Sequence, residues 1–181
     1  QVDGGEPGAD YSYDYPSSTL KILTGKPMSV SMSDGVAQTE RDRIVVPSGT
    51  NADVALAGVD VRLSGDDDCA FEVQPGASAN VTLAEGSANS LVSGANHAGL
   101  EVSDGASVVI DGKGSLTAKC FSEGFAYGAG IGGGYGGSGG IVKIAGGMVT
   151  ASCEGVGDYG SSYGAGIGGG SNGSGGSVEI T

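Results

Sequence analysis

The stretch YGAGIGGG at residues 127–134 decides the fold of this chain, because it returns at residues 163–170, 36 residues later. The following segments keep the same spacing, with GGIVKI at residues 139–144 and GGSVEI at residues 175–180. A block this rich in glycine does not form a helix, since each internal Gly costs about 1 kcal/mol relative to Ala. Glycine blocks in phase with alternating aliphatic residues are typical of a repeat architecture.

Weaker copies of the repeat occur upstream, and they align in three ladders of apolar residues. The first ladder is Ile44, Phe71, Leu100, Ile131 and Ile167. The second is Leu56, Leu83, Ile110, Ile144 and Ile180, and the third is Leu63, Leu91, Leu116 and Val149. Three ladders in a fixed order predict three strands per coil. Offsets of 27 to 36 residues predict connecting loops of different length.

The ladders predict an all-β fold, a right-handed parallel β-helix with three strands in each coil. Coils stacked ~4.8 Å apart bury like residues over like. Each buried aliphatic side chain then contributes roughly 1.5–3 kcal/mol. A β-sandwich is the alternative, and the in-phase ladders favour the solenoid.

Two regions of the chain are expected. Residues 1–18 form an acidic, tyrosine-containing lead, in which Tyr11, Tyr13 and Tyr15 alternate with strand period. These rings are expected on the flank of the solenoid or on a neighbouring molecule. Residues 19–181 form a single β-helix domain, either whole or as a fragment of a longer chain.

Composition excludes several classes of partner. The net charge is −13 and only 8 residues are Lys or Arg, so nucleic acid is not an expected partner. No apolar run approaches the ~20 residues of a membrane span. The acidic balance and abundant Gly, Ser, Thr and Asn fit an exported bacterial protein. We therefore expect an extracellular or cell-surface location.

Several segments together resemble a family of β-helical repeat domains from secreted or wall-anchored proteins of Gram-positive bacteria. They are DYSY at residues 10–13, LKI at 20–22, DRIVV at 42–46, NVTL at 80–83, GSLTA at 114–118, and the two GAGIGGG blocks. The resemblance implies a β-helix and an extracellular location, and most members have no assigned activity. A related group of β-helix proteins is described as carbohydrate-binding, with calcium, which is an analogy only.

Two cysteines occupy equivalent positions in the repeat, Cys120 in LTAKC and Cys153 in VTASC. Stacked coils bring such Cα atoms to ~5 Å, within the range for a disulfide. An exported protein permits the bond. A Cys120–Cys153 disulfide is therefore a candidate, with two buried thiols as the alternative. Cys69 has no evident partner and is expected to be a small interior residue.

The candidate metal site is the run Asp66-Asp67-Asp68. Carboxylates crowded on one turn can bind Ca²⁺, which takes six to eight oxygen ligands. A solvated loop is the alternative. His97 is the only histidine, and we expect neither a catalytic set nor a histidine-based metal cluster around it.

The candidate ligand-binding residues are tyrosines beside the glycine blocks: Tyr127, Tyr135, Tyr159 and Tyr163. Tyr is rigid and amphipathic, which suits contact with a sugar. Tyr127 and Tyr163 are repeat equivalents and are expected to form an exposed aromatic step. The alternative is that the rings cover the glycine-rich corners.

No catalytic set is evident, so the sequence favours a non-catalytic extracellular surface module whose role is display, adhesion or the binding of a glycan. The alternative is a structural subunit of an extracellular fibre that self-associates through open solenoid ends. An enzyme acting on polysaccharide is a third hypothesis, for which Glu72 and Glu101 are ladder equivalents on an outward face.

Overall fold

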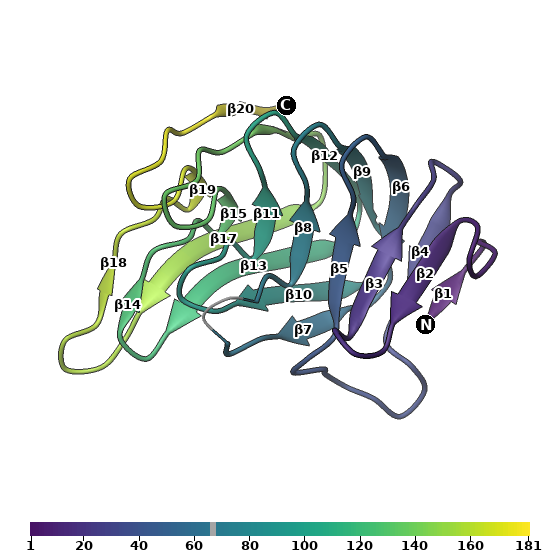
Figure 1. Cartoon of the computed structure of the whole chain (residues 1–181), viewed down its shortest axis with the longest axis horizontal. Helices are drawn as coiled ribbons and strands as arrows, with labels where there is room; N and C mark the ends of the chain where they lie inside the picture. Colours follow the sequence, from purple (N-terminus) through teal and green to yellow (C-terminus); the bar gives the residue numbers. More distant parts are fainter. Residues whose placement is uncertain (66–67) are drawn as a thin grey trace.

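A computed structural model of the chain describes residues 1–65 and 68–181, and these residues form strands and turns without a helix. The strands wind into a parallel β-solenoid of about four turns (Figure 1). Each complete coil contributes one strand to each of three sheets, which we name sheets 1, 2 and 3 in chain order. The prediction of an all-β parallel solenoid with three strands per coil is confirmed.

The strands of each sheet come from successive coils. Sheet 1 contains β2 (Tyr11–Asp14), β3 (Thr19–Ile22), β5 (Arg43–Val46), β8 (Phe71–Val73), β11 (Leu100–Val102), β15 (Ile131–Gly132) and β19 (Ile167–Gly168). Sheet 2 contains β1 (Val2–Asp3), β4 (Met28–Val30), β6 (Asn51–Leu56), β9 (Ser78–Leu83), β12 (Ser107–Gly112), β16 (Ile141–Ile144) and β20 (Ser177–Ile180). Sheet 3 contains β7 (Asp60–Arg62), β10 (Ala88–Ser93), β13 (Ser115–Ser122) and β17 (Met148–Gly155).

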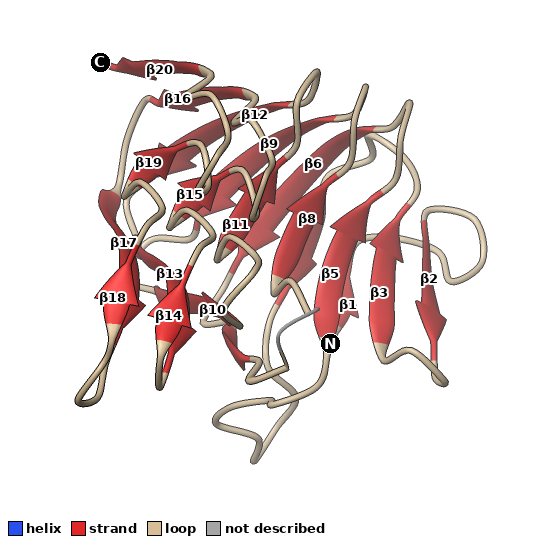
Figure 2. Cartoon of the chain, turned by 60° about the vertical axis from the view of Figure 1, so that its left-hand side comes forward, coloured by secondary structure: helices blue, strands red, loops and turns tan. Residues whose placement is uncertain are grey.

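A short fourth sheet lies where the chain passes from sheet 3 to sheet 1 in the last coils. It pairs β14 (Phe125–Ala126) with β18 (Ser161–Ser162), in parallel (Figure 2). Both strands stand apart from the three main sheets, at the end of the solenoid that contains the glycine blocks. This corner carries the aromatic residues considered below.

The register of sheet 1 follows the first predicted ladder at every step. Ile44 pairs with Phe71, Phe71 with Leu100, Leu100 with Ile131, and Ile131 with Ile167. The offsets of 27 to 36 residues are therefore confirmed for this sheet.

The second ladder is wrong by two residues at one step. Ile110 pairs with Val81, while Leu83 pairs with Gly112. A shift of two residues leaves every side chain on its original face, so the hydrophobic pattern does not distinguish the two registers. Gly112 has φ +108°, and a Cβ there would meet the backbone of Leu83. Glycine at this position allows the close approach that the true register needs.

The third ladder is wrong for the same reason. Leu91 pairs with Val61 and with Ala118, not with Leu63 and Leu116. Leu116 pairs with Asn89 on one side and with Val149 on the other, and only this last step was predicted. Inward positions of sheet 3 therefore bring residues of different size over one another, such as Leu91 beside Ala118 and Leu116 beside Asn89.

The solenoid interior is a continuous apolar core. Its largest fully buried side chains include Phe71, Leu83, Leu91, Leu100 and Leu116. Three polar residues among those described are also buried, Thr19, Asn89 and Ser93, and Asn89 has the most extensive hydrogen bonds of them. Its Oδ1 accepts hydrogen bonds from the backbone N–H groups of Gly58 and Val59, both at 2.9 Å, and its Nδ2 donates to the carbonyl of Ser115 at 3.0 Å. The side chain thus ties three successive coils together.

The tyrosine-containing lead packs on its own chain. β1 pairs antiparallel with β4, and β2 pairs antiparallel with β3, so both cover strand edges at the N-terminal end of the solenoid. The N-terminal ammonium of Gln1 donates to the carbonyl of Ser31 at 2.9 Å. These contacts form an N-terminal cap on sheets 1 and 2.

The opposite end of the solenoid presents β20 as the outermost strand of sheet 2. Val178 and Ile180 continue the inward positions of Val142 and Ile144. They are exposed by 45% and 69%, whereas Val142 and Ile144 are buried. Val178 and Ile180 are therefore the most exposed residues of their two ladders.

Candidate functional site

Four aromatic rings form a contiguous surface at the corner between sheets 3 and 1. We call Phe125, Tyr127, Tyr135 and Tyr163 the aromatic platform. Tyr127 stacks on Tyr163 with ring centroids 5.5 Å apart and an interplanar angle of 12°. Tyr135 lies 5.0 Å from Tyr127, and Phe125 lies 6.1 Å from Tyr163. The rings of Phe125, Tyr135 and Tyr163 are exposed by 46%, 56% and 54%.

Backbone pairing sets the position of each platform ring. Because β14 pairs in parallel with β18, the residues that follow them, Tyr127 and Tyr163, occupy neighbouring steps of the same ladder. The N–H of Tyr163 donates to the carbonyl of Ala126 at 2.8 Å. The N–H of Tyr135 donates to the carbonyl of Asn96 at 2.7 Å. The platform is therefore held by main-chain hydrogen bonds and needs little ordering before it meets a ligand.

Three of the four predicted tyrosines belong to the platform, and one does not. Tyr159 is 86% exposed, and its ring forms no aromatic pair with another ring of the described chain. The sequence prediction missed Phe125, which lies two residues before Tyr127. Its equivalent in the next coil is Ser161, so it has no repeat signal.

Cys120 and Cys153 lie directly opposite each other in sheet 3, on β13 and β17. The predicted equivalence of these two positions is confirmed. Both thiols are free in this structure, and the disulfide itself stays a prediction. Burial raises the pKa of Cys120 to about 12, with a further contribution from the neighbouring Cys153.

A second cluster joins Cys69, His97 and Glu101, whose potential ligand atoms all lie within 4.8 Å of one another. His97 Nδ1 lies 2.7 Å from Glu101 Oε2, and the N–H of Ala98 donates to the same oxygen at 3.2 Å. The hydrogen bond with Glu101 raises the pKa of His97 above its ordinary value, against the opposing effect of burial. No metal cluster is expected around His97 from the sequence, whereas the structure brings two further potential ligands, Cys69 and Glu101, to this residue.

The sequence contains one signal for this cluster, in the first ladder. The first ladder, which was correct, aligns Phe71 with Leu100. That alignment puts Cys69 opposite Ala98, next to His97, and puts Glu101 beside Glu72. The three residues therefore meet at one corner, although 28 residues separate Cys69 from His97.

Cys69 is not an activated nucleophile in this arrangement. The side chain is fully buried, and Sγ donates weakly to the carbonyls of Phe71 and Ala98 at 3.3 and 3.4 Å. Burial raises the pKa of Cys69 well above its ordinary value, and the nearby carboxylates of Glu101 and Glu72 add to this. A thiol that stays protonated and covered lacks the thiolate that nucleophilic catalysis requires.

Glu72 and Glu101 are neighbours in sheet 1, as the sequence predicts. Each has a different partner. Glu72 Oε2 accepts a hydrogen bond from the Arg43 guanidinium at 2.8 Å, whereas Glu101 contacts His97. The two carboxylates therefore form two separate pairs rather than one acid–base dyad facing a cleft.

The calcium prediction falls largely outside the described residues, since Asp66 and Asp67 are not among them. Asp68 is described and its side chain is exposed. Within residues 1–65 and 68–181, Asp68 belongs to no group of three potential metal ligands. Calcium binding by this run stays a prediction.

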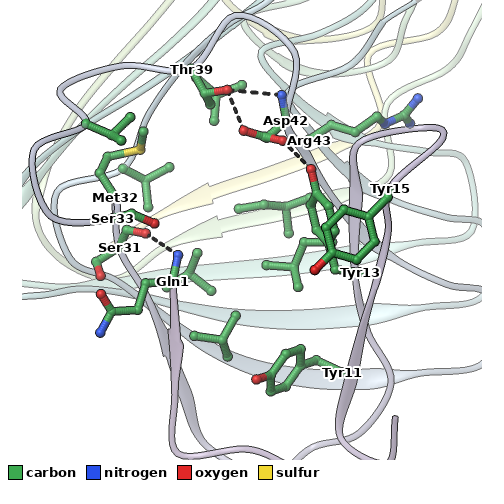
Figure 3. Close-up of a pocket in the computed structure, with 17 residues that line it drawn as sticks. Gln1, Tyr11, Tyr13, Tyr15, Ser31, Met32, Ser33, Thr39, Asp42 and Arg43 are labelled. Carbon is green, nitrogen blue, oxygen red and sulfur yellow. Dashed lines mark hydrogen bonds between the residues drawn. The ribbon is translucent and has the colours of Figure 1, made fainter. Parts of the chain in front are cut away.

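A pocket of about 480 Å³ lies at the N-terminal end of the solenoid (Figure 3). Apolar residues including Leu20, Val30 and Val61 are part of its lining. Figure 3 shows Tyr11 and Tyr13 on one side of the pocket and Gln1 and Ser31 on the other. The Tyr13 hydroxyl donates to Asp42, which raises the pKa of Tyr13. The first turn runs beside β7 through a single parallel bridge between Thr39 and Val61, and both residues line the pocket.

A groove of about 750 Å³ runs across the outer face of sheet 3. Outward residues of three strands line it, among them Arg62, Val92, Lys119 and Phe121. Arg62 pairs with Asp60 at 3.0 Å and Lys119 pairs with Glu154 at 2.7 Å. Both cations of the groove are thus already neutralised by the chain itself.

Comparison of the chain with protein-family models, with curated proteins and with solved structures found no match. The resemblance to the repeat domains of bacterial surface proteins therefore stays a prediction. The described residues contain no helix that is long and apolar enough to cross a membrane.

Proposed function

We propose that this chain is a non-catalytic, extracellular surface module that binds a neutral glycan at the aromatic platform. The observation that carries the proposal is the in-register stack of Tyr127 and Tyr163, extended by Tyr135 and Phe125 into one exposed surface. Large aromatic residues gathered at a solvent-exposed site are a common mark of a binding surface.

The chemistry of the rings fits a sugar. Sugar rings present apolar C–H faces that pack on aromatic rings, while their hydroxyl groups need polar partners. The hydroxyl groups of Tyr127, Tyr135 and Tyr163 form no hydrogen bond to another side chain or backbone group of the described residues, so they are free to serve a ligand. The net charge of −13 disfavours an anionic polysaccharide, which is why the proposal is restricted to a neutral one.

The local geometry gives less support to catalysis. The buried thiol of Cys69 is not activated, and the carboxylates of Glu72 and Glu101 are held by Arg43 and His97 respectively. None of these three groups is free to act as a nucleophile or as a general acid–base pair. Turnover that Glu72→Gln or Glu101→Gln abolished would revive this third hypothesis.

Affinity electrophoresis through gels that contain cellulose derivatives, xylan or mannan tests the proposal. We expect retardation of the wild-type protein by at least one neutral polysaccharide. Tyr163→Ala and Tyr127→Ala should each weaken that binding about tenfold or more, because loss of one stacking ring is worth roughly 1–3 kcal/mol.

Tyr159→Ala is the matched control, since Tyr159 is an exposed tyrosine of the same region outside the platform. It should bind as the wild type does. Phe121→Ala separates the platform from the groove of sheet 3, where Phe121 is 37% exposed. Binding lost in Phe121→Ala and kept in Tyr163→Ala would move the site to the groove, and no retardation by any glycan would reject the proposal.

The second hypothesis, a fibre subunit, depends on docking through the solenoid ends. The N-terminal end carries the antiparallel strands β1 and β2. A second copy that met this end would pair with an antiparallel strand and would not continue the parallel repeat. This favours the glycan-binding module over a head-to-tail fibre. Sedimentation velocity at high concentration should show a monomer, and filaments that grow with concentration would support the fibre.

A further inference from the structure

We propose that Cys69, His97 and Glu101 form a binding site for Zn²⁺. The proposal concerns the corner beside β8 and β11 and does not depend on glycan binding at the platform. It rests on three observations: the convergence of the three ligand atoms, the departure of these positions from the repeat, and the space that glycines leave around them.

The donor set suits zinc. A thiolate, an imidazole nitrogen and a carboxylate oxygen are the three ligand types that Zn²⁺ takes in proteins, and three protein ligands leave one coordination position for solvent. Bond lengths of 2.0–2.3 Å in a tetrahedral site separate ligand atoms by about 3.3–3.6 Å. The three atoms here lie within 4.8 Å, with His97 Nδ1 and Glu101 Oε2 2.7 Å apart. Side-chain adjustments of about 1 Å therefore suffice to surround the ion.

The charges also balance. A Zn²⁺ ion with one thiolate, one carboxylate and one neutral imidazole gives a site of zero net charge, which is the least costly state for a mostly buried cluster. The nearest other charges, Arg43 and Glu72, neutralise each other through a 2.8 Å contact. The ion itself would supply the charge that removes the proton from Cys69.

None of the three side chains is required by the solenoid. The positions equivalent to Cys69 in the later coils hold Ala98, Ala129 and Ala165, as the register of sheet 1 shows. Those equivalent to His97 hold Gly128 and Gly164, and those equivalent to Glu101 hold Gly132 and Gly168. In the later coils the same corner is thus built from alanine and glycine. In the coil before, the positions of His97 and Glu101 hold Asp68 and Glu72, and the cluster combines Cys69 of that coil with His97 and Glu101 of the next.

The surroundings leave room for the cluster and a route to it. A Cβ on Gly134 would lie 3.0 Å from Glu101 Oε2, so glycine there leaves the carboxylate its place. The side chain of His97 is 29% exposed and that of Glu101 is 14% exposed, whereas Cys69 is buried beneath them. An ion reaches the thiol by way of the imidazole and the carboxylate.

Titration of the reduced protein with ZnCl₂, followed by isothermal calorimetry and by metal analysis after gel filtration, tests the site. We expect one Zn²⁺ per chain and a higher melting temperature with zinc than without it. Replacement of Zn²⁺ by Co²⁺ should produce a thiolate-to-cobalt charge-transfer band and the intense visible absorption of a tetrahedral site.

Three variants test each ligand in turn. Cys69→Ser should abolish the charge-transfer band and weaken zinc binding about 100-fold, while His97→Gln and Glu101→Gln should weaken binding at least tenfold. Cys153→Ser is the control for the other cysteine pair and should keep both the band and the affinity. The melting temperature of each metal-free variant shows whether the fold has survived.

Two outcomes overturn the proposal. The first is that the reduced wild-type protein binds no stoichiometric zinc at micromolar concentration. The second is that Cys69→Ser binds zinc as well as wild type does, or that Cys153→Ser loses the cobalt band. If zinc does not bind and His97→Gln lowers the melting temperature, the cluster is an ion pair that only stabilises the corner.

Discussion

Two coils of the solenoid have the same topology but differ in their packing. One contains β8, β9 and β10, and the other contains β15, β16 and β17. In the earlier coil, aliphatic and aromatic side chains fill the interior, and Phe71, Leu83 and Leu91 are fully buried. In the later coil, sheet 1 has shrunk to the two residues of β15, and glycines approach the backbone of the next turn directly.

The connecting loops differ between the two halves as well. In the glycine-rich half the loops stack on one another through main-chain hydrogen bonds. Gly133 donates to the carbonyl of Gly168, Gly136 to that of Ser171, and Gly139 to that of Ser174, at 2.8–2.9 Å. A loop that takes part in the ladder must have the same length in both coils. This explains why the last two copies are spaced by 36 residues in both sheet 1 and sheet 2.

The comparison shows that two kinds of contact between coils stabilise the same solenoid. The N-terminal half depends on burial of large side chains, which tolerates loops of different length. The C-terminal half depends on close backbone contact, which tolerates only glycine at the contact points. Four predictions test this contrast, from the largest expected effect to the smallest.

Substitution of Gly132 should cause the largest loss of stability. Gly132 has φ +131°, and a Cβ there would meet the carbonyl group of Gly168 in the next coil. Gly132→Val combines a strained backbone with an overpacked contact, so the free energy of unfolding should fall by about 3–5 kcal/mol. Urea unfolding followed by circular dichroism measures it.

Gly136→Ala provides the matched control for Gly132→Val. Gly136 also has a positive φ, of +70°, yet nothing lies within 4 Å of a Cβ at that position. Its cost should be only about 1–2 kcal/mol. Equal losses at the two positions would mean that backbone conformation, and not contact between coils, determines the need for glycine.

Oxidation should tie the last two coils together through Cys120 and Cys153. These residues face each other across β13 and β17, and a disulfide closing this loop is worth about 3–4 kcal/mol. Reduction should lower the free energy of unfolding of the wild-type protein by that amount. It should leave the free energy of unfolding of Cys153→Ser unchanged. Mass spectrometry that finds both thiols open to alkylation without reductant would contradict the prediction.

Side-chain truncation at two positions of the first ladder, one in the middle of the solenoid and one in its last turn, should lower the free energy of unfolding by different amounts. Leu100 is fully buried between Phe71 and Ile131, whereas Ile167 is only partly buried at the outer turn. Leu100→Ala should cost about 3–4 kcal/mol and Ile167→Ala about 1–2 kcal/mol. Chemical denaturation of both variants measures the difference. A larger cost at Ile167 would contradict the view that burial of large side chains matters more in the N-terminal half than in the C-terminal half.

Acid should loosen the N-terminal cap slightly. The N–H of Glu6 donates to Asp10, and the ammonium of Lys26 lies 3.0 Å away, so the pKa of Asp10 is held below its ordinary value. A lowered pKa in the folded state means that this stabilisation is complete above the unfolded pKa of about 3.9 and is lost as the pH falls through the lower pKa of the folded state.

Asp10→Asn should therefore melt slightly earlier than wild type at pH 7 and together with wild type at pH 2. Asp34→Asn is the control, since the Asp34 side chain makes no hydrogen bond to another described residue. Hydrogen exchange at the amides of β2 measures the effect locally. A constant difference between Asp10→Asn and wild type at both pH values would exclude the carboxylate as its source.

The sequence by itself determined the solenoid, the three strands per coil and the register of sheet 1. It did so because single aliphatic residues such as Ile131 and Ile167 stand alone among glycines, so their alignment has no competitor. The same clarity predicted that Cys120 faces Cys153 and that Tyr127 lies beside Tyr163.

Only the tertiary structure decided the registers of sheets 2 and 3, the antiparallel N-terminal cap and the neighbours of His97. In sheets 2 and 3 apolar residues occur at every second position, and a slip of two residues keeps them all inward. The register there depends on local contacts such as those of Gly112 and Asn89. Cys69, His97 and Glu101 meet only because two coils of fixed length bring one corner back over itself, and side-chain positions at such a corner follow from the path of the chain rather than from residue type.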